Sequence, residues 1–166
     1  QKDFGNRDPK SSFLTEIATT IGVLQHAIKN VDKWTKDEKR PSNVDRPIFI
    51  RMLMGFLGSK SYIKYQPLGT VGVISPWNFP VNLILAPLGG IFAAGNRAMI
   101  KPSELTPATS EVTKRMFEAY FDKSEAAVFT GDAEVGAAFS ALPFDHLLFT
   151  GGTQIGKKVM KAASDN

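Results

Sequence analysis

Four strand-helix units follow one another between Gly69 and Asn166, and this alternation constrains the fold most strongly. Short β-branched or apolar runs predict strands at 71–75, 98–101, 126–130 and 146–150. Longer apolar or amphipathic segments predict helices at 81–94, 107–120, 133–142 and 153–163. Such alternation indicates the α/β class, with a parallel sheet and helices on both of its faces. We expect the aromatic residues of this region, from Trp77 to Phe144, mainly in its core.

The first part of the chain has a different pattern. Apolar residues recur at spacings of three and four across 11–34, which predicts an amphipathic helix. Residues 35–47 are polar and contain two prolines, so we expect a linker, and residues 61–66 alternate like a strand. We therefore divide the chain into residues 1–66, with the helix, linker and an arm strand, and residues 67–166, with the β-α units.

Composition argues against several classes of site and partner. The chain contains no cysteine, which removes disulfides and thiolate metal ligands, and no residue cluster predicts a metal site. The net charge of +4 comes from residues 1–64, so we expect no nucleic-acid partner for the sheet region. The longest apolar run, 79–94, is short for a membrane-spanning helix and is interrupted by Pro87, so we expect no membrane contact. The lack of cysteine fits a reducing compartment, and we expect a cytoplasmic protein.

Polar side chains follow the first two strands of the alternation. Asn78, within Pro-Trp-Asn-Phe-Pro at 76–80, can donate to a developing oxyanion or can cap the following helix. Lys101 and Glu104 can hold ribose hydroxyls, or can form a surface ion pair beside a capping box at Ser103. Because the carboxyl ends of parallel strands share one edge, we expect these side chains where open α/β sheets bind ligands.

A glycine-rich turn joins the fourth strand to its helix. It reads Gly-Gly-Thr-Gln-Ile-Gly-Lys from Gly151 to Lys157. Glycines let the backbone approach a phosphate, and the helix N-terminus presents N–H groups, so we predict a phosphate-binding loop. The alternative is a turn that only starts the helix. The spacing also matches a P-loop, but Lys158 stands where Ser or Thr must hold Mg²⁺, which argues against a nucleotide hydrolase.

Together, these motifs resemble the aldehyde dehydrogenase superfamily. The resemblance rests on Pro-Trp-Asn-Phe-Pro at 76–80, Ala-Ala-Gly-Asn at 93–96, Lys-Pro-Ser-Glu-x-Thr-Pro at 101–107 and Phe-Thr-Gly-Gly-Thr-x-x-Gly at 149–156. Residues 65–69 and 139–151 look most like the coniferyl aldehyde dehydrogenase branch. The resemblance implies a Rossmann-like domain that binds NAD, with NADP as the alternative. It also implies an extended arm that forms a homo-oligomer, a dimer or a tetramer.

The resemblance implies roles for individual residues. Asn78 resembles the side-chain donor to a thiohemiacetal oxyanion, and Lys101 and Glu104 resemble the residues that hold the adenosine ribose. Because Glu104 would repel a 2′-phosphate, NAD is favoured over NADP, although Lys101 offsets this. The residues that would line the cofactor cleft are Ile74, Pro76 and Trp77. Those that would face the pyrophosphate are Gly151, Gly152, Thr153, Gln154, Ile155 and Gly156.

Two departures from the family pattern limit what the chain can do. Gly152 replaces the family's usual serine, which removes one hydroxyl contact to the pyrophosphate. In the family a cysteine attacks the aldehyde, hydride passes to nicotinamide, and a glutamate-activated water hydrolyses the thioester. The resemblance places that cysteine and that glutamate beyond Asn166.

We therefore expect part of an NAD(P)-dependent aldehyde dehydrogenase, without its catalytic domain and inactive alone. Its parent would oxidise an aromatic aldehyde, such as coniferaldehyde, to the carboxylic acid. A non-catalytic dinucleotide-binding or assembly module is the alternative.

Overall fold

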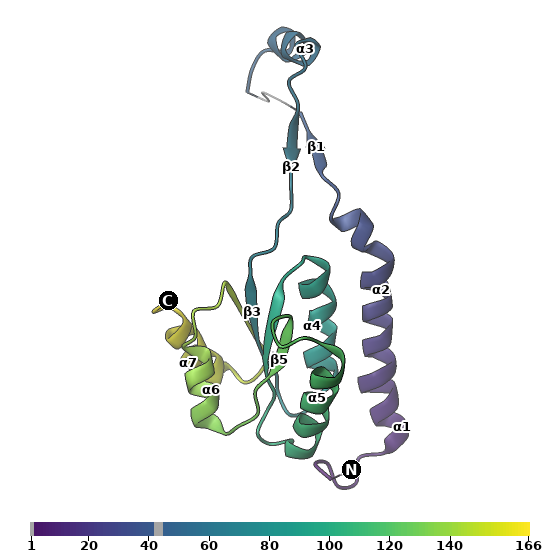
Figure 1. The fold of residues 1–166 in the computed structure, drawn as a ribbon, viewed down its shortest axis with the longest axis vertical. Helices are drawn as coiled ribbons and strands as arrows, with labels where there is room; N and C mark the ends of the chain where they lie inside the picture. Colours follow the sequence, from purple (N-terminus) through teal and green to yellow (C-terminus); the bar gives the residue numbers. More distant parts are fainter. Residues whose placement is uncertain (1, 42–44) are drawn as a thin grey trace.

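A four-stranded parallel sheet forms the centre of the computed structural model, which describes residues 2–41 and 45–166 (Figure 1). The strands are β3 (Thr70–Ile74), β4 (Arg97–Lys101), β5 (Ala126–Val128) and β6 (His146–Phe149). The helices that follow them are α4 (Asn82–Ala93), α5 (Pro107–Tyr120), α6 (Ala133–Ser140) and α7 (Thr153–Ala163). The predicted α/β class with a parallel sheet is confirmed.

The order of the strands creates a switch point beside β3. The sheet runs β5-β4-β3-β6, so the chain adds β4 and β5 on one side of β3 and then returns to add β6 on the other. The register pairs Ile74 with Lys101 of β4 and with Phe149 of β6. The carboxyl ends of three strands are therefore level, and a crevice outside such a switch point is where open α/β sheets bind ligands.

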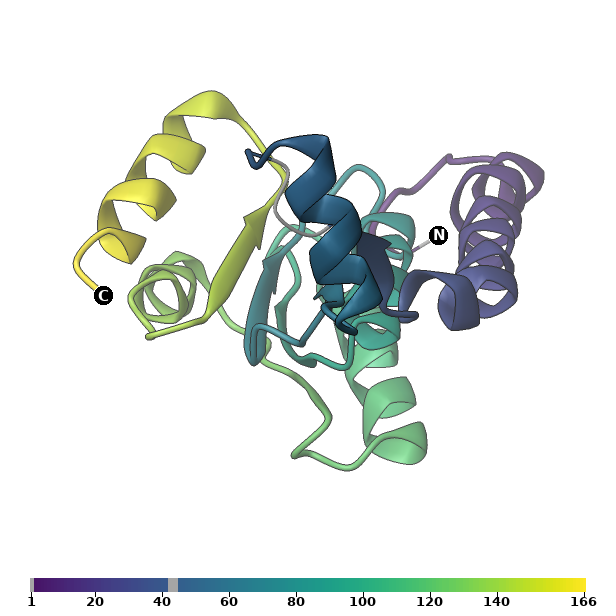
Figure 2. The same cartoon turned by 90° about the horizontal axis from the view of Figure 1, so that it is seen from above.

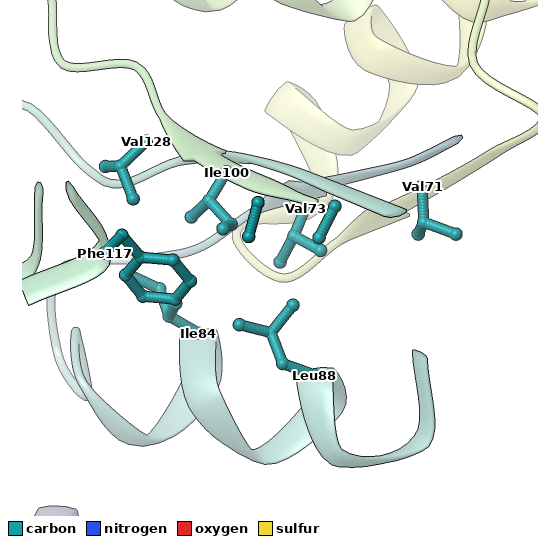
Figure 3. Close-up of a cluster of buried hydrophobic side chains, with 9 residues drawn as sticks. Val71, Val73, Ile84, Leu88, Ile100, Phe117 and Val128 are labelled. Carbon is teal, nitrogen blue, oxygen red and sulfur yellow. The ribbon is translucent and has the colours of Figure 1, made fainter. Parts of the chain in front are cut away.

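The hydrophobic core lies between the sheet and the helices α4 and α5. Figure 3 shows Ile84 and Leu88 of α4 and Phe117 of α5 pointing toward Val73 and Ile100 of the sheet. These five side chains are at most 2% exposed. Helices α6 and α7 lie on the opposite face of the sheet (Figure 2). Burial of apolar surface stabilises a fold by about 25 cal/mol per Å², so this packing holds the strand ends in fixed positions.

The N-terminal helical region lies outside α4 (Figure 1). It consists of α1 (Pro9–Ser12), the π-helix η1 (Phe13–Ala18) and α2 (Thr19–Trp34). Helix α2 packs closely on α4, since a Cβ added at Gly89 would lie 3.3 Å from the Cβ of Ala27. The predicted helix is thus present, but it contains a π-helical segment that the spacing of apolar residues did not predict.

A thin arm extends from the body (Figure 1). Strand β1 (Glu38–Arg40) pairs antiparallel with β2 (Ser61–Ile63), and α3 (Ile48–Phe56) connects them. The expectation of a linker throughout 35–47 is wrong where β1 forms, and residues 42–44 of that linker lie outside the described residues. Among the described residues, no helix is both long and apolar enough to cross a membrane.

Candidate functional site

Asn78 lies in the corner that connects β3 to α4, residues 75–81. Its side chain is exposed, and its amide makes no hydrogen bond within the part of the chain that the structure describes. Helix α4 begins at Asn82, with Val81 at the N-cap position. The alternative prediction that Asn78 caps this helix is therefore wrong. Its amide NH₂ stays available to a ligand as a hydrogen-bond donor.

The cap of α4 comes instead from a distant carboxylate. The N–H groups of Val81 and Asn82 donate to Oε2 of Glu16, at 3.1 and 2.9 Å. Glu16 is 5% exposed, and Arg7 Nη1 lies 3.3 Å from its other oxygen. A carboxylate at a helix N-terminus satisfies N–H groups that have no partner inside the helix and interacts favourably with the helix dipole. Sequence reasoning missed this contact because its partners are 65 residues apart.

Lys101 is buried at the end of β4, 2% exposed, and its Nζ donates to the carbonyl of Pro102 at 2.8 Å. Burial lowers the pKa of Lys101, because desolvation disfavours the ammonium ion, while Glu104 and Asp132 partly offset this. Glu104 itself is exposed. The alternative of a surface ion pair is wrong, since Lys101 is not at the surface.

The capping box at Ser103 is not formed either. The Ser103 hydroxyl accepts from the Leu105 N–H, and α5 begins four residues later at Pro107. The cap of α5 comes from Asp3, whose carboxylate accepts from the N–H groups of Ala108 and Thr109 at 3.0 and 2.7 Å. Residues near the N-terminus thus cap both α4 and α5.

Asp3 provides a test of this capping through pH. Burial alone would raise the pKa of Asp3, but hydrogen bonds from Thr109 and Ala108 outweigh it and hold the pKa below its usual value of 3.8. The stabilisation that the ionised Asp3 carboxylate gives the folded state is therefore present above pH 3.8. It is lost as the pH falls through the lowered pKa of Asp3. We expect Asp3→Ala to lower the free energy of unfolding by about 1 kcal/mol at pH 7. Urea denaturation at several pH values should show this difference shrinking in acid, and a difference that does not change with pH would contradict the assignment.

The glycine-rich turn lies between β6 and α7. Gly152 is the N-cap residue of α7, with φ −69° and ψ 144°, and no side chain caps the helix. Residues 151–155 are exposed, so the first N–H groups of α7 face solvent. A Cβ at Gly151 would lie 2.6 Å from Cζ of the Phe149 ring, whereas a Cβ at Gly152 would have no heavy atom within 4 Å. Gly151 therefore makes room for an aromatic ring, and Gly152 is open to a ligand.

Backbone hydrogen bonds draw these segments together beyond the strand ends. The Ser75 N–H donates to the carbonyl of Lys101 at 3.2 Å, and the Thr150 N–H donates to the carbonyl of Ile74 at 3.0 Å. The Ser75 hydroxyl is buried at this edge and has no hydrogen-bond partner in the described chain. Trp77 is 52% exposed here, so its expected place in the core is wrong. One edge of the sheet thus brings together all the predicted site segments.

Next to this edge, the ends of β4 and β5 border a cavity of about 290 Å³. Its lining includes the carboxylates of Glu104, Glu111 and Asp132. Within the described ranges, no group of three or more metal-ligating side chains is placed to hold a metal ion. Glu104, Glu111 and Asp132 make the cavity acidic, and it lies beside the buried ammonium group of Lys101.

Residues 5–166 match the model of the aldehyde dehydrogenase family. The chain belongs to this family. It is 54% identical, over 99% of its length, to a probable coniferyl aldehyde dehydrogenase of Caulobacter vibrioides, and it covers 33% of that protein. The predicted membership of the family, with coniferyl aldehyde dehydrogenases among its most similar relatives, is confirmed.

Two solved aldehyde dehydrogenases have the same fold. A substrate-bound Staphylococcus aureus enzyme gives a TM-score of 0.82 at 41% identity, over 93% of this chain and 32% of that one. A Mycobacterium tuberculosis aldehyde dehydrogenase complexed with NAD⁺ gives 0.74 at 25% identity, over 95% of this chain and 30% of that one. The chain spans about a third of the length of these relatives.

Proposed function

We propose that the chain supplies the cofactor-binding part of an NAD-dependent aldehyde dehydrogenase, with its site at the carboxyl ends of β3 and β6. The observation that carries this proposal is the switch point, where hydrogen bonds from Ser75 and Thr150 hold three strand ends level. The β-α units of residues 67–166 would form the dinucleotide-binding domain. The NAD⁺ complex of the Mycobacterium tuberculosis relative supports the choice of cofactor.

The residues present fit a dinucleotide. The uncapped N-terminus of α7 would bind the pyrophosphate through the N–H groups of Thr153 and Gln154, and the open space at Gly152 admits it. Ile74, Pro76 and Trp77 would line the cleft. Bound there, the nicotinamide would accept the hydride that an aldehyde loses on oxidation.

The ribose end of the site favours NAD over NADP. Glu104 would accept from ribose hydroxyls, and Lys101 would hold its buried ammonium group beside them. A 2′-phosphate in this cavity would meet Glu104, Glu111 and Asp132. Repulsion between these carboxylates and the phosphate disfavours its binding, and the Lys101 ammonium group already donates to the Pro102 carbonyl.

Asn78 would act on the other substrate. Its exposed amide would donate to the aldehyde oxygen as negative charge develops there. The most similar relatives support an aromatic aldehyde of the coniferaldehyde class, oxidised to the carboxylic acid. The chain contains no cysteine, so a cysteine thiohemiacetal requires residues outside it.

Two neighbouring glycines test the cofactor site. We expect Gly152→Ser to leave stability unchanged and to tighten NAD⁺ binding severalfold, because the new hydroxyl enters open space beside the pyrophosphate. Gly151→Ala is the matched variant, and we expect it to weaken binding because its methyl group must displace the Phe149 ring. Calorimetric titration with NAD⁺ and NADP⁺ measures both effects. Tighter binding of NADP⁺ than of NAD⁺, or equal effects of the two substitutions, would contradict this assignment.

We also propose that the arm joins copies of the protein into a homo-oligomer. Helix α3 buries none of its residues within the chain, and Phe49, Met52 and Phe56 are 71, 72 and 90% exposed. Apolar surface of this kind favours association. We expect sedimentation to show dimers or larger species that dissociate in Phe56→Glu, and a monomer at high concentration would contradict the proposal.

A further inference from the structure

Two charged residues from the N-terminal region hold the Asn78 corner from both sides. Before Pro80, Arg7 Nη1 donates to the backbone carbonyl of Asn78 at 3.0 Å. The Arg7 guanidinium carbon also lies 5.3 Å from the centroid of the Phe79 ring. After Pro80, Glu16 accepts from the N–H groups at the start of α4. The corner is therefore fixed at its backbone, while the Asn78 side chain stays free for a ligand.

The two holding residues also fix each other. Arg7 Nη1 lies 3.3 Å from Glu16 Oε1, and the two side chains are only 20% and 7% exposed. Arg7 Nη2 donates to the Thr15 hydroxyl at 3.2 Å, and the guanidinium carbon lies 4.9 Å from the Phe4 ring centroid. A planar guanidinium with several partners has one permitted orientation. The pair thus links helix η1, the corner and the start of α4 into one rigid unit.

The π-helix η1 explains how Glu16 reaches the corner. Glu16 lies within η1, between the regular helices α1 and α2. Next to it, the hydroxyls of Thr19 and Thr20 accept from Nδ2 of Asn82, at 3.0 and 2.9 Å. π-Helices are rare, occur mostly as single turns within α-helices, and are frequently found at functional sites. Here the wider turn places one carboxylate against the first N–H groups of α4.

We propose that Arg7 and Glu16 are positioning residues for the oxidation step, acting through Asn78. They set the backbone of the corner and so aim the Asn78 amide at the aldehyde oxygen. This inference rests on the proposed function, in which Asn78 donates to the developing oxyanion. A misplacement of about 1 Å at a reacting centre can lower a rate by about 10²-fold. A cap that only stabilised α4 would need Glu16 but not the bond from Arg7 to the Asn78 carbonyl.

A double-mutant cycle separates these roles. The test enzyme is a hybrid in which this chain replaces the matching third of the Caulobacter relative. We expect Arg7→Gln to lower kcat by about 10-fold or more, with the KM for NAD⁺ changed less than about twofold. In an Asn78→Ala background, Arg7→Gln should have no further effect, because the group that it positions is gone. Arg7→Lys should retain part of the rate. Asp8→Asn, which alters only the local cap of α1, should match the parent hybrid.

The outcomes distinguish the proposed role of Asn78 from the positioning role of Arg7. If Asn78→Ala leaves kcat unchanged, the proposed role of Asn78 fails. If Asn78→Ala lowers kcat but Arg7→Gln acts equally in both backgrounds, or not at all, the positioning role is overturned.

A measurement on the chain itself does not depend on turnover. In NMR spectra of the ¹⁵N-labelled chain, Arg7→Gln should shift the Asn78 side-chain amide and the N–H signals of Val81 and Asn82, while Asp8→Asn leaves them in place. Unmoved Asn78 signals in Arg7→Gln would overturn the proposal by this route as well.

Discussion

Asn78→Ala in the hybrid enzyme is expected to lower kcat for aldehyde oxidation by about 10²- to 10³-fold, the typical cost of removing one oxyanion donor. Its side chain is exposed and makes no hydrogen bond within the described residues, so the substitution breaks no side-chain hydrogen bond there. We therefore expect the thermal stability and the affinity for NAD⁺ to stay close to those of the parent hybrid. Steady-state kinetics with an aromatic aldehyde, together with calorimetric titration of NAD⁺, measures these quantities.

Asn96→Ala is the matched control, because Asn96 is an asparagine of another family motif at the opposite edge of the sheet. Its Oδ1 accepts from the N–H groups of Leu68 and Gly69, at 2.6 and 3.0 Å. Losing it leaves those donors unsatisfied and should lower stability while kcat changes little. If Asn96→Ala lowered kcat and Asn78→Ala left it unchanged, Asn78 would have no role in the oxidation step.

Phe117→Ala should have the largest effect on stability, a loss of about 3–5 kcal/mol in the free energy of unfolding. Phe117 is 1% exposed and belongs to the core cluster shown in Figure 3. Its ring stacks on Phe121 with 5.1 Å between centroids, so the substitution removes packing and leaves a cavity. Since small domains are stable by only about 5–15 kcal/mol, this loss is a large fraction of the total stability.

Tyr120→Ala is the control for this substitution on the same helix. Tyr120 is 81% exposed, and surface changes of this kind stay within about 0.5 kcal/mol. Urea denaturation of the three proteins gives the comparison. Similar losses for Tyr120→Ala and Phe117→Ala would show that the core does not lie where the structure places it.

The sequence predicted the β-α elements well because their signals are local. Helices α5 and α7 have the bounds that the sequence predicted, 107–120 and 153–163. For the other strands and helices of residues 70–163, the observed and predicted bounds differ by at most two residues. Strand order was not predicted, because any order of the four strands is compatible with the same alternation. The switch point between β3 and β6, on which the candidate site depends, therefore comes from the structure alone.

The residues that hold the site were missed because their contacts are distant in sequence. Glu16 and Asp3 accept from the N–H groups of Asn82 and Ala108, which lie 66 and 105 residues later in the chain. One signal was present: Glu16 and Thr20 lie four apart on the face of the helical region that is buried, while Phe13 stays 57% exposed. The spacing of the apolar residues indicated the face that contains Phe13 instead, so the buried carboxylate was missed.

Exposure at the sheet edge was also misjudged. Trp77 and Phe79 were expected in the core, yet they are 52% and 37% exposed, since the corner projects beyond the ends of the strands. Strand β1 was missed because a two-stranded arm has no buried face, so its residues 38–40 carry no apolar alternation. Both differences concern segments that leave the sheet.

The most direct test of the central claim is a titration of the ¹⁵N-labelled chain with NAD⁺, followed through its backbone N–H signals. We expect the signals that shift to belong to the ends of β3, β4 and β6, with the largest changes at 151–156 and at 74–77. Shifts confined to the arm or to the amino ends of the strands, or no shifts at saturating NAD⁺, would contradict the assignment of a dinucleotide site to this edge of the sheet.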